Sequence, residues 1–485
     1  MEPNLTLKTA HVVDILGNVI GRDQQIMTME KSLKLVSLLD QNDFFDEKVV
    51  FFDPFCKAGE ILLSCAFLSC WSRSKKMGST LELEDVKREL YESGRYFGLS
   101  PDERHHRLSL RTFLGNTNSH SEKYSQIIRN GNYLSEIDGR LDQNKFKEEF
   151  YNMLDYINSS SIPQKIIAVG NPPYQETDGG AGASAKPIYN FFVESLMASN
   201  VISEFVLVIP ARWFSAGKGL DSFRKTIMEC NQIKSITYFE KAEEVFPTVQ
   251  IKGGLCFLHW SLFHNKSAPI FITGSQQTSV NLSQYDIIPD DPNATKIIQK
   301  ILNSGKVNQY VSSIAWPGKP FGLRTYYFQR NECVNENSPK ALKCYTAGRK
   351  IKYIDRELVQ KNSDKIVCYK VVAPKAYGKG MKRCTLPKQQ IFILDRNEIC
   401  TETYNVIGCY ESKDLAENLQ RYLQTDFARY LLGLRKITQD IPKDRWNWVP
   451  YLDISKKWTD EQLFMLFDLT LEEQLHIKRK VKEWS

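Results

Sequence analysis

Short apolar runs alternate with amphipathic stretches through about the first 285 residues of the chain. The apolar runs predict strands at 49–52 and within SGRYFGLSPDE, KIIAVGNPP, EFVLVIPARWF, IKSITYFEKAEEVFP and GGLCFLHWSLF. Helical spacing of apolar residues predicts helices at 28–40, 59–71 and 144–157, and within PIYNFFVESLMAS and GLDSFRKTIMECN. Residues 75–85 are expected to form a polar break, and 116–160 are polar apart from the predicted helix. Strands alternating with helices form βαβ units, so we predict an α/β fold with a doubly wound, mostly parallel sheet.

The pattern changes in the second half of the chain. IIPDDPNATKIIQKIL is typical of a linker that leads into a helix. Short strand-like pieces follow in KIVCYKVVAPKAYG, QQIFILD and TYNVIGCY, and then amphipathic helical segments in LAENLQRYLQTDFARYLLGL and TDEQLFMLFDLTLEEQLHIKRKVKEW. We therefore predict an N-terminal arm at 1–27, a first domain at 28–300 and a second, mixed α+β domain at 301–485.

Composition narrows the class of protein. The chain has 485 residues, of which 42% are hydrophobic and 25% charged, and its net charge is +7. The apolar runs are shorter than the roughly 20 residues that span a membrane, and the N-terminus resembles no targeting peptide. The 11 cysteines include no C-x-x-C pair, which favours reduced thiols in a cytoplasm and neither a disulfide framework nor a metal site. The basic balance allows a polyanionic partner.

The segment FFDPFCKAGEILL places a strand, a tight turn and a helix in succession. Doubly wound folds approach nucleotide-like cofactors in this way, at the carboxyl end of a strand. Gly59 would allow close backbone approach, and a helix N-terminus favours an anion. Neither G-x-x-x-x-G-K-[ST] nor G-x-G-x-x-G is present, so ATP and NAD are not expected. The alternative is an ordinary strand–helix turn.

The tetrapeptide Asn171-Pro172-Pro173-Tyr174 follows a predicted buried strand. The two prolines fix φ and restrict the preceding residues, so the segment should be rigid and extended. It would present the Asn171 amide and the Pro172 carbonyl as acceptors beside the ring of Tyr174. Two acceptors next to an aromatic face suit an exocyclic amino group on a planar ring, such as a flipped adenine. The alternative is a stiff turn with a half-buried tyrosine.

The order of D-P-F-C-K-A-G and N-P-P-Y resembles the S-adenosylmethionine-dependent N6-adenine DNA methyltransferases. Within them, the chain is similar to the large restriction–modification class with a C-terminal target-recognition domain. Segments such as VLVIPARWFSAGKGLDSFRK and GKPFGLRTYYF extend the resemblance from about residue 28 to the end. It implies a Rossmann-like class I methyltransferase domain, S-adenosylmethionine as cofactor, double-stranded DNA as substrate and a cytoplasmic, bacterial, archaeal or phage-encoded protein. A separately encoded restriction endonuclease is an implied partner.

The resemblance also implies roles for residues near the first strand. Thr28 matches the segment that closes over the methionine end of the cofactor, although Met29 stands where the family often has proline. The cofactor loop corresponds to Asp53, Pro54, Phe55, Cys56 and Gly59. Lys57 stands where the common pattern has glycine. If that position needs a positive φ, a side chain costs about 1–2 kcal/mol, and cofactor binding would be weaker or the loop a variant one.

Three further positions carry less specific expectations. Ser100 stands where an acidic residue usually binds the ribose, with Asp102 and Glu103 displaced from it. Asn116 or Asn118 would border the adenine ring of the cofactor. Phe246 matches a loop whose aromatic supports the flipped base; the alternative is an ordinary core aromatic.

Cations gather among glycines and aromatics in the second half of the chain. PGKPFGLRTYYF and PKAYGKGMKR contain the candidate DNA contacts Lys319, Arg324, Lys375 and Lys379. Such cations would neutralise phosphates or bind guanine edges, whereas solvated loops are the alternative for each.

The expected chemistry at the target nitrogen needs no general base. Hydrogen bonds from N6–H to Asn171 and Pro172 would localise the nitrogen lone pair and stabilise its growing positive charge. RNA or a protein glutamine amide would satisfy the same groups, so these substrates stay open. A DNA-binding specificity protein with weakened catalysis is a third reading. No run resembles the P-D…(D/E)-x-K nuclease pattern, so we expect no DNA cleavage by this chain alone.

Overall fold

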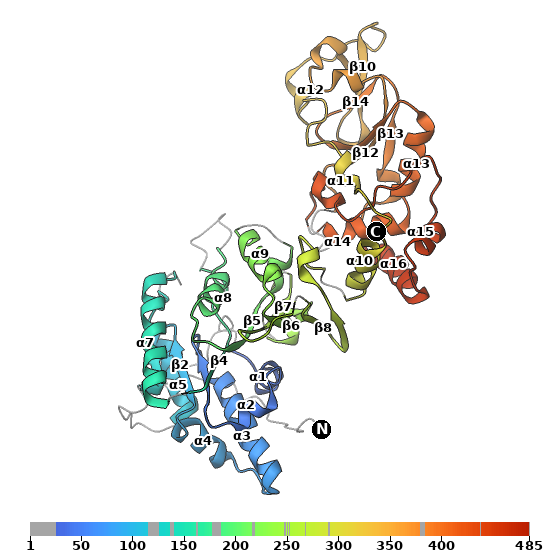
Figure 1. Ribbon diagram of the computed structural model, residues 1–485. Coiled ribbons are helices and arrows are strands. Elements are labelled where there is room, and N and C mark those ends of the chain that lie inside the picture. The colour runs from blue at the N-terminus through green and yellow to red at the C-terminus, as the bar shows by residue number, and fades with distance from the viewer. Residues whose placement is uncertain are drawn as a thin grey trace. The chain divides into compact units, whose positions relative to one another are not determined.

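The chain divides into two compact units, Met1–Pro292 and Asn293–Ser485, each of which is described by itself (Figure 1). The computed structural model describes residues 26–114, 126–135, 140–161, 163–176, 186–215, 219–246, 249, 251, 253–266, 268–289, 292–378, 384–436 and 438–484. The boundary precedes the predicted one at residue 300, because helix α10 (Pro292–Asn303) falls almost entirely in the second unit. Among the described residues, no helix combines the length and apolarity that a membrane crossing requires.

A nine-stranded sheet forms the centre of the first unit as far as it is described. Its order is β3 (Ile128–Asn130), β2 (Tyr96–Ser100), β1 (Val49–Asp53), β4 (Lys165–Gly170), β5 (Glu204–Pro210), β7 (Leu255–Ser261), β6 (Ile233–Phe239), β8 (Ile270–Thr273) and β9 (Gln276–Ser279). The first five of these pair in parallel, and β7 runs antiparallel to both β5 and β6. The predicted mostly parallel sheet is therefore confirmed. Its strand order reverses between β1 and β4, which places a topological switch point there.

Helices flank the sheet of the first unit (Figure 1). They are α1 (Met29–Val36), α2 (Gln41–Phe45), α3 (Glu60–Met77), α4 (Leu83–Glu92), α5 (Glu103–Leu114), α7 (Gln143–Ser161), α8 (Tyr189–Met197) and α9 (Asp221–Glu229). The polar break predicted at 75–85 is confined to residues 78–82, because α3 runs to Met77 and α4 begins at Leu83. A capping box between Glu82 and Asp85 starts α4. The predicted helix at 28–40 ends at Val36, and α5 and β3 were not predicted.

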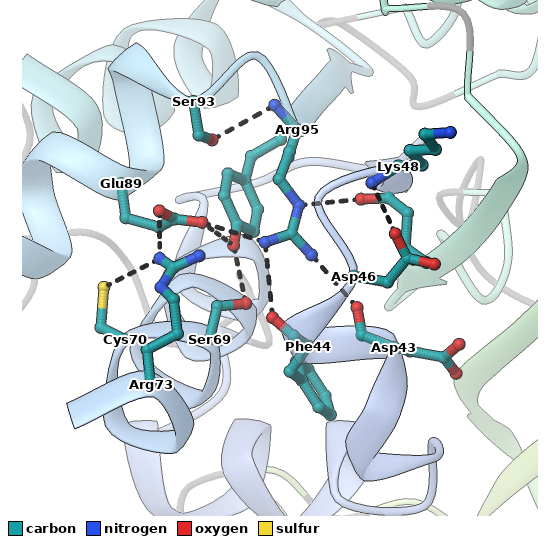
Figure 2. A network of polar contacts seen from close by, with 12 residues as sticks. Asp43, Phe44, Asp46, Lys48, Ser69, Cys70, Arg73, Glu89, Ser93 and Arg95 are labelled. Atoms are coloured by element: carbon teal, nitrogen blue, oxygen red, sulfur yellow. Dashed lines mark hydrogen bonds and ion pairs between the residues drawn. The ribbon is translucent and has the colours of Figure 1, made fainter. Parts of the chain in front are cut away.

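A buried arginine fastens the amino ends of β1 and β2 to three helices (Figure 2). The Arg95 side chain is 3% exposed. It donates to the backbone carbonyls of Asp43, Phe44 and Val49. Arg95 also forms an ion pair of 3.1 Å with Glu89 of α4, which in turn pairs with Arg73 of α3 and accepts from the Tyr96 hydroxyl. Because these contacts lie at the amino edge, they hold the sheet rigid without occupying its carboxyl edge.

A second buried charge cluster lies at the amino ends of the next two strands. Glu204, the first residue of β5, accepts from His259 Nε2 at 2.6 Å and Lys234 Nζ at 2.8 Å. Its other oxygen lies 2.6 Å from Lys165 Nζ, at the start of β4. Burial raises the pKa of Glu204, but the bonds from His259 and the two lysines outweigh it and hold the pKa well below its usual value.

The second unit contains two three-stranded sheets within its described residues. One orders β11 (Ile351–Asp355), β10 (Ala341–Tyr345) and β14 (Glu398–Cys400), and the other β13 (Phe392–Leu394), β12 (Tyr369–Pro374) and β15 (Tyr404–Tyr410). Helices α11 (Val311–Ile314), α12 (Tyr327–Arg330), α13 (Lys413–Leu423), α14 (Asp426–Arg435), α15 (Asp460–Leu466) and α16 (Leu471–Glu483) accompany them. Each predicted amphipathic segment folds as two helices, because Thr425 and Thr470 cap a new helix within it.

Candidate functional site

The two sequence motifs meet at the switch point of the sheet. Phe52 of β1 pairs with Ala168 of β4, so the two strands end side by side. Asp53 closes β1, and Gly170 closes β4 directly before the tetrapeptide at 171–174. A Cβ atom at Gly170 would lie 2.9 Å from Asp53 Oδ1 and 2.8 Å from the ring of Phe55. The glycine therefore lets the loop after β1 lie against the residues that follow β4.

The loop after β1 is shaped by its own buried groups. Asp53 is 2% exposed, and its Oδ1 accepts from the backbone N–H of Phe55 at 2.9 Å. Burial raises the pKa of this carboxyl well above its ordinary value. The N–H of Cys56 donates to the carbonyl of Leu99 at 3.0 Å, which ties the loop to β2. The carbonyl of Pro54 accepts from a buried tyrosine hydroxyl after β3.

The backbone angles of this loop show which of its positions have a positive φ. Gly59 adopts φ +74° as it caps α3, and a Cβ atom there would lie 3.1 Å from the Phe113 ring. Glycine is therefore strongly favoured at this position. Lys57 is not among the described residues with positive φ. The expected strain from a lysine in place of glycine is therefore absent.

The Lys57 side chain lies between the two motifs. It is 8% exposed, and its Nζ is 5.8 Å from the centroid of the Tyr174 ring. The part of the chain that the structure describes offers this ammonium no hydrogen bond and no ion pair. Burial lowers the Lys57 pKa to about 8, although the more distant charges of Glu60, Asp53 and Asp102 oppose the shift.

The tetrapeptide itself is more enclosed than the sequence suggested. Asn171 is 2% exposed, Pro172 is buried and Pro173 is half-buried. Tyr174 is 7% exposed, and its carbonyl accepts from the N–H of Ile188 at 3.1 Å. Its buried hydroxyl has no hydrogen-bond partner among the described residues, and burial raises its pKa well above the usual value.

The start of α1 is fastened to the same loop. Thr28 caps α1 by accepting from the N–H of Lys31 at 3.4 Å. The preceding N–H, of Met27, donates to Glu60 Oε1 at 3.2 Å, and Ala58 N–H donates to Oε2 at 3.3 Å. Glu60 was not predicted as a site residue. The signal for it was an acidic side chain in the first helical turn, directly after the loop glycine.

The end of β2 contributes a buried hydroxyl to this edge. Ser100 is fully buried, and its Oγ has no hydrogen-bond partner among the described residues. Asp102 instead caps α5: its carboxylate contacts His105 Nδ1 at 2.6 Å and accepts from His105 N–H at 2.8 Å. Burial raises the pKa of Asp102, and the bonds from His105 more than reverse that shift. Glu103 accepts from the Asn130 amide at 2.8 Å. Asn116 and Asn118 lie outside the described residues.

Two aromatic residues follow strands that lie far apart in the sheet order, Tyr133 after β3 and Phe246 after β6. Phe246 follows the short helix η3 (Ala242–Glu244) after β6 and is 2% exposed, so it packs as a core side chain in this state. Tyr133, which the sequence analysis did not single out, donates its hydroxyl to the Pro54 carbonyl at 2.8 Å. Nothing in the local sequence marked Tyr133, because the contact spans 79 positions.

The second unit brings two predicted DNA contacts to one carboxylate. Arg324 and Lys375, about half exposed, each lie 3.7 Å from Glu402 Oε2. Glu402 is 8% exposed, and its Oε1 accepts from Thr325 N–H at 3.3 Å. Glu402 was not predicted. Lys319 lies in the same unit with φ +59°, and Lys379 falls outside the described residues.

No cluster of three or more histidine, cysteine or acidic side chains that could bind a metal ion occurs in the described ranges.

Part of the first unit matches a known protein family. Residues 71–246 match the family described as Eco57I restriction-modification methylase. This is less than half of the chain, and it includes 171–174 but not the loop after β1. An uncharacterized adenine-specific methylase of Mycoplasma pneumoniae is 33% identical over 98 residues, which is 19% of this chain. The matched segment spans 23% of that relative's length.

Solved structures align over larger shares of the chain at lower similarity. The type IIG restriction endonuclease BpuSI aligns with 96% of this chain and 61% of its own, at 10% identity and TM-score 0.41. A nuclease-deletion mutant of the type ISP restriction–modification enzyme LlaGI aligns with 86% of this chain and 52% of its own, at 10% identity and TM-score 0.42. The M protein of the type I restriction enzyme EcoKI aligns with 52% of this chain and 48% of its own, at 14% identity and TM-score 0.34.

Proposed function

We propose that the chain is a site-specific DNA methyltransferase that modifies the N6 amino group of adenine with S-adenosylmethionine as methyl donor. The observation that carries the proposal is the meeting of the tetrapeptide at 171–174 with the Asp53 loop at the switch point. The restriction–modification methylase family matched over 71–246 and the adenine-specific methylase of Mycoplasma pneumoniae support the same chemistry. The cellular role would be the modification component of a restriction–modification or related defence system.

The carboxyl edge of the sheet fits a nucleoside cofactor. Gly59 holds the backbone close to the N-terminus of α3, where a side chain would be obstructed. The buried Ser100 hydroxyl, which lacks a described partner, is suited to a cofactor hydroxyl or ring nitrogen. Thr28 and Glu60, which accepts from the N–H of Met27 beside Thr28, would hold the methionine end. Phe55 and Cys56 are buried in the loop after β1. Their side chains and backbone would form part of the wall of the cofactor site.

The tetrapeptide would hold the acceptor nitrogen. When bound, S-adenosylmethionine supplies an electrophilic methyl group on its sulfonium. The Asn171 side chain and the Pro172 carbonyl would accept hydrogen bonds from the two N–H groups of the target amine. These bonds would stabilise the positive charge that grows on the nitrogen. Tyr174 would stack on the base, a contact worth roughly 1–3 kcal/mol. Pro173 keeps these groups at a fixed spacing, so positioning provides much of the rate enhancement.

The second unit would recognise the DNA. Arg324 and Lys375 are exposed enough to reach phosphates or base edges while Glu402 orients them. Lys319 and Lys379 remain candidate contacts, and Phe246 a candidate support for the flipped base after rearrangement. A separately encoded restriction endonuclease remains a proposed partner. The absence of backbone strain at Lys57 speaks against the alternative of a specificity protein with weakened catalysis.

The reaction is tested by transfer of labelled methyl from S-adenosylmethionine to duplex DNA, RNA and glutamine peptides in parallel. Asn171→Ala should abolish transfer to DNA while leaving S-adenosylhomocysteine affinity near that of the wild type. Gln175→Ala, which removes the exposed amide four residues further on, is the matched control and should retain activity. Label in RNA or peptide but not in DNA, or a variant at Asn171 retaining more than a few per cent of the rate, would contradict the proposal.

A further inference from the structure

Lys57 is the feature of the first unit that the proposed reaction leaves without a role. Its side chain is nine-tenths buried, it extends from the Asp53 loop toward the tetrapeptide, and its ammonium contacts the Tyr174 ring face at 5.8 Å. An ammonium removed from water loses several kcal/mol of hydration unless a counter-charge compensates. No carboxylate in the described residues lies within ion-pair distance of Lys57.

The surrounding acids are already committed to other groups. Asp53 accepts from Phe55 N–H, Glu60 accepts from the N–H groups of Met27 and Ala58, and Asp102 pairs with His105. A cation–π contact at 5.8 Å is worth about 0.5–2 kcal/mol and does not replace an ion pair. Within the described ranges, Lys57 is therefore a buried cation beside the switch point with no carboxylate at ion-pair distance.

We propose that Lys57 is an anion-binding residue of this site, which pairs with an oxyanion that the substrate complex brings into the crevice. The inference rests on the proposed function, because the two oxyanions available are the carboxylate of the cofactor's amino-acid end and a phosphate beside the flipped nucleotide. Both offer two or more oxygens to an ammonium. The burial of Lys57 favours the carboxylate, because the DNA backbone stays at the surface of a binding cleft.

The lowered pKa of Lys57 is consistent with this role. Because burial lowers it to about 8, the ammonium is mostly protonated near neutral pH and can bind an anion there. An anion beside Nζ would raise the pKa again. The charged groups facing this position are Asp53, Glu60 and Asp102, and none of them supplies the missing contact.

The carboxylate is tested by calorimetric titration of the full chain with two ligands. One is S-adenosylhomocysteine, and the other is its decarboxylated analogue, which keeps the nucleoside, sulfur and amine. Wild type should prefer S-adenosylhomocysteine by about 10-fold or more, the strength of a hydrogen bond to a charged group. Lys57→Met should lose this preference while its affinity for the decarboxylated analogue stays unchanged. Lys57→Arg should restore part of the preference. Lys75→Met, at an exposed lysine over Trp71 near the far end of α3, should behave as wild type.

The phosphate is tested by measuring, as a function of salt concentration, the affinity for a DNA duplex that contains the sequence which the protein methylates. If Lys57→Met keeps the ligand preference but lowers the slope of log affinity against log salt by about one, the phosphate is the partner. Unchanged ligand preference together with an unchanged salt slope would overturn the proposal, as would tighter binding of S-adenosylhomocysteine by Lys57→Met. If wild type binds neither nucleoside ligand, the proposal that S-adenosylmethionine is the cofactor is contradicted. The salt slope of DNA affinity, compared between wild type and Lys57→Met, then decides alone whether Lys57 binds an anion.

Discussion

Replacing Lys57 by methionine should stabilise the first unit at neutral pH, although it removes a residue of the proposed site. The folded pKa of Lys57 is about 8, against an ordinary value of 10.5. Each unit of this difference corresponds to 1.36 kcal/mol, so the buried charge costs about 3 kcal/mol of folding free energy when it is protonated. Methionine has a similar unbranched shape and carries no charge.

The pH dependence of this effect has a definite sign. The unfolded chain keeps the Lys57 proton up to about pH 10.5, whereas the folded chain releases it near pH 8. Protonation therefore favours unfolding. The destabilisation is fully present below pH 8, shrinks between pH 8 and 10.5 and vanishes above that range. The advantage of Lys57→Met should follow the same course.

The assay is urea unfolding of the full chain, read by hydrogen exchange of peptides from β1 and β4. These peptides report the first unit alone, which matters because two units need not unfold together. Lys57→Met should raise the free energy of unfolding by about 3 kcal/mol at pH 7, and Lys75→Met should change it by less than about 0.5 kcal/mol. A variant no more stable than wild type at pH 7, or a gain that does not shrink with rising pH, would refute the reasoning.

Substitutions at five further positions test other parts of the molecule. Tyr174→Phe should keep methyl transfer in a kinetic assay, because the hydroxyl has no described partner, whereas Tyr174→Ala should slow it about 10- to 100-fold by removing the stacking surface. Glu204→Gln should lower the free energy of unfolding of the first unit by about 3–5 kcal/mol in urea; in wild type this contribution is present above pH 4.5 and is lost only on acidification below it, because the folded pKa is lowered. Arg324→Ala and Lys375→Ala should each reduce the salt slope of DNA affinity by about one, and unchanged slopes would exclude phosphate contact. Gly59→Ala should lower the thermal unfolding temperature, at a cost of about 1–2 kcal/mol from the positive φ alone.

The sequence was sufficient to predict a mostly parallel sheet and to place each of the two motifs at the carboxyl end of a strand. Asp53 and Asn171 each follow a short apolar run, and parallel strands bring their carboxyl ends to one edge regardless of the distance along the chain. These inferences need only the hydrophobic period and the direction of the strands.

The remaining features depend on side chains that meet only after folding. Glu60, Tyr133 and Glu402 contact partners 33, 79 and 77 positions away, and no local pattern fixes such pairs. Helix α4 was missed because its capping box lies in a stretch whose polar residues resembled a loop. The effect of Lys57 depended on a φ angle that the sequence does not give.

The central claim is tested most directly by single-molecule sequencing of plasmid DNA from a methylation-deficient bacterial host that expresses this chain. The account predicts N6-methyladenine in one recurring sequence word, and its absence from cells that express the Asn171→Ala variant at equal soluble level. Unmodified adenine with the wild-type protein soluble, or the same methylation with the variant, would contradict the assignment of the tetrapeptide as the site of adenine methylation.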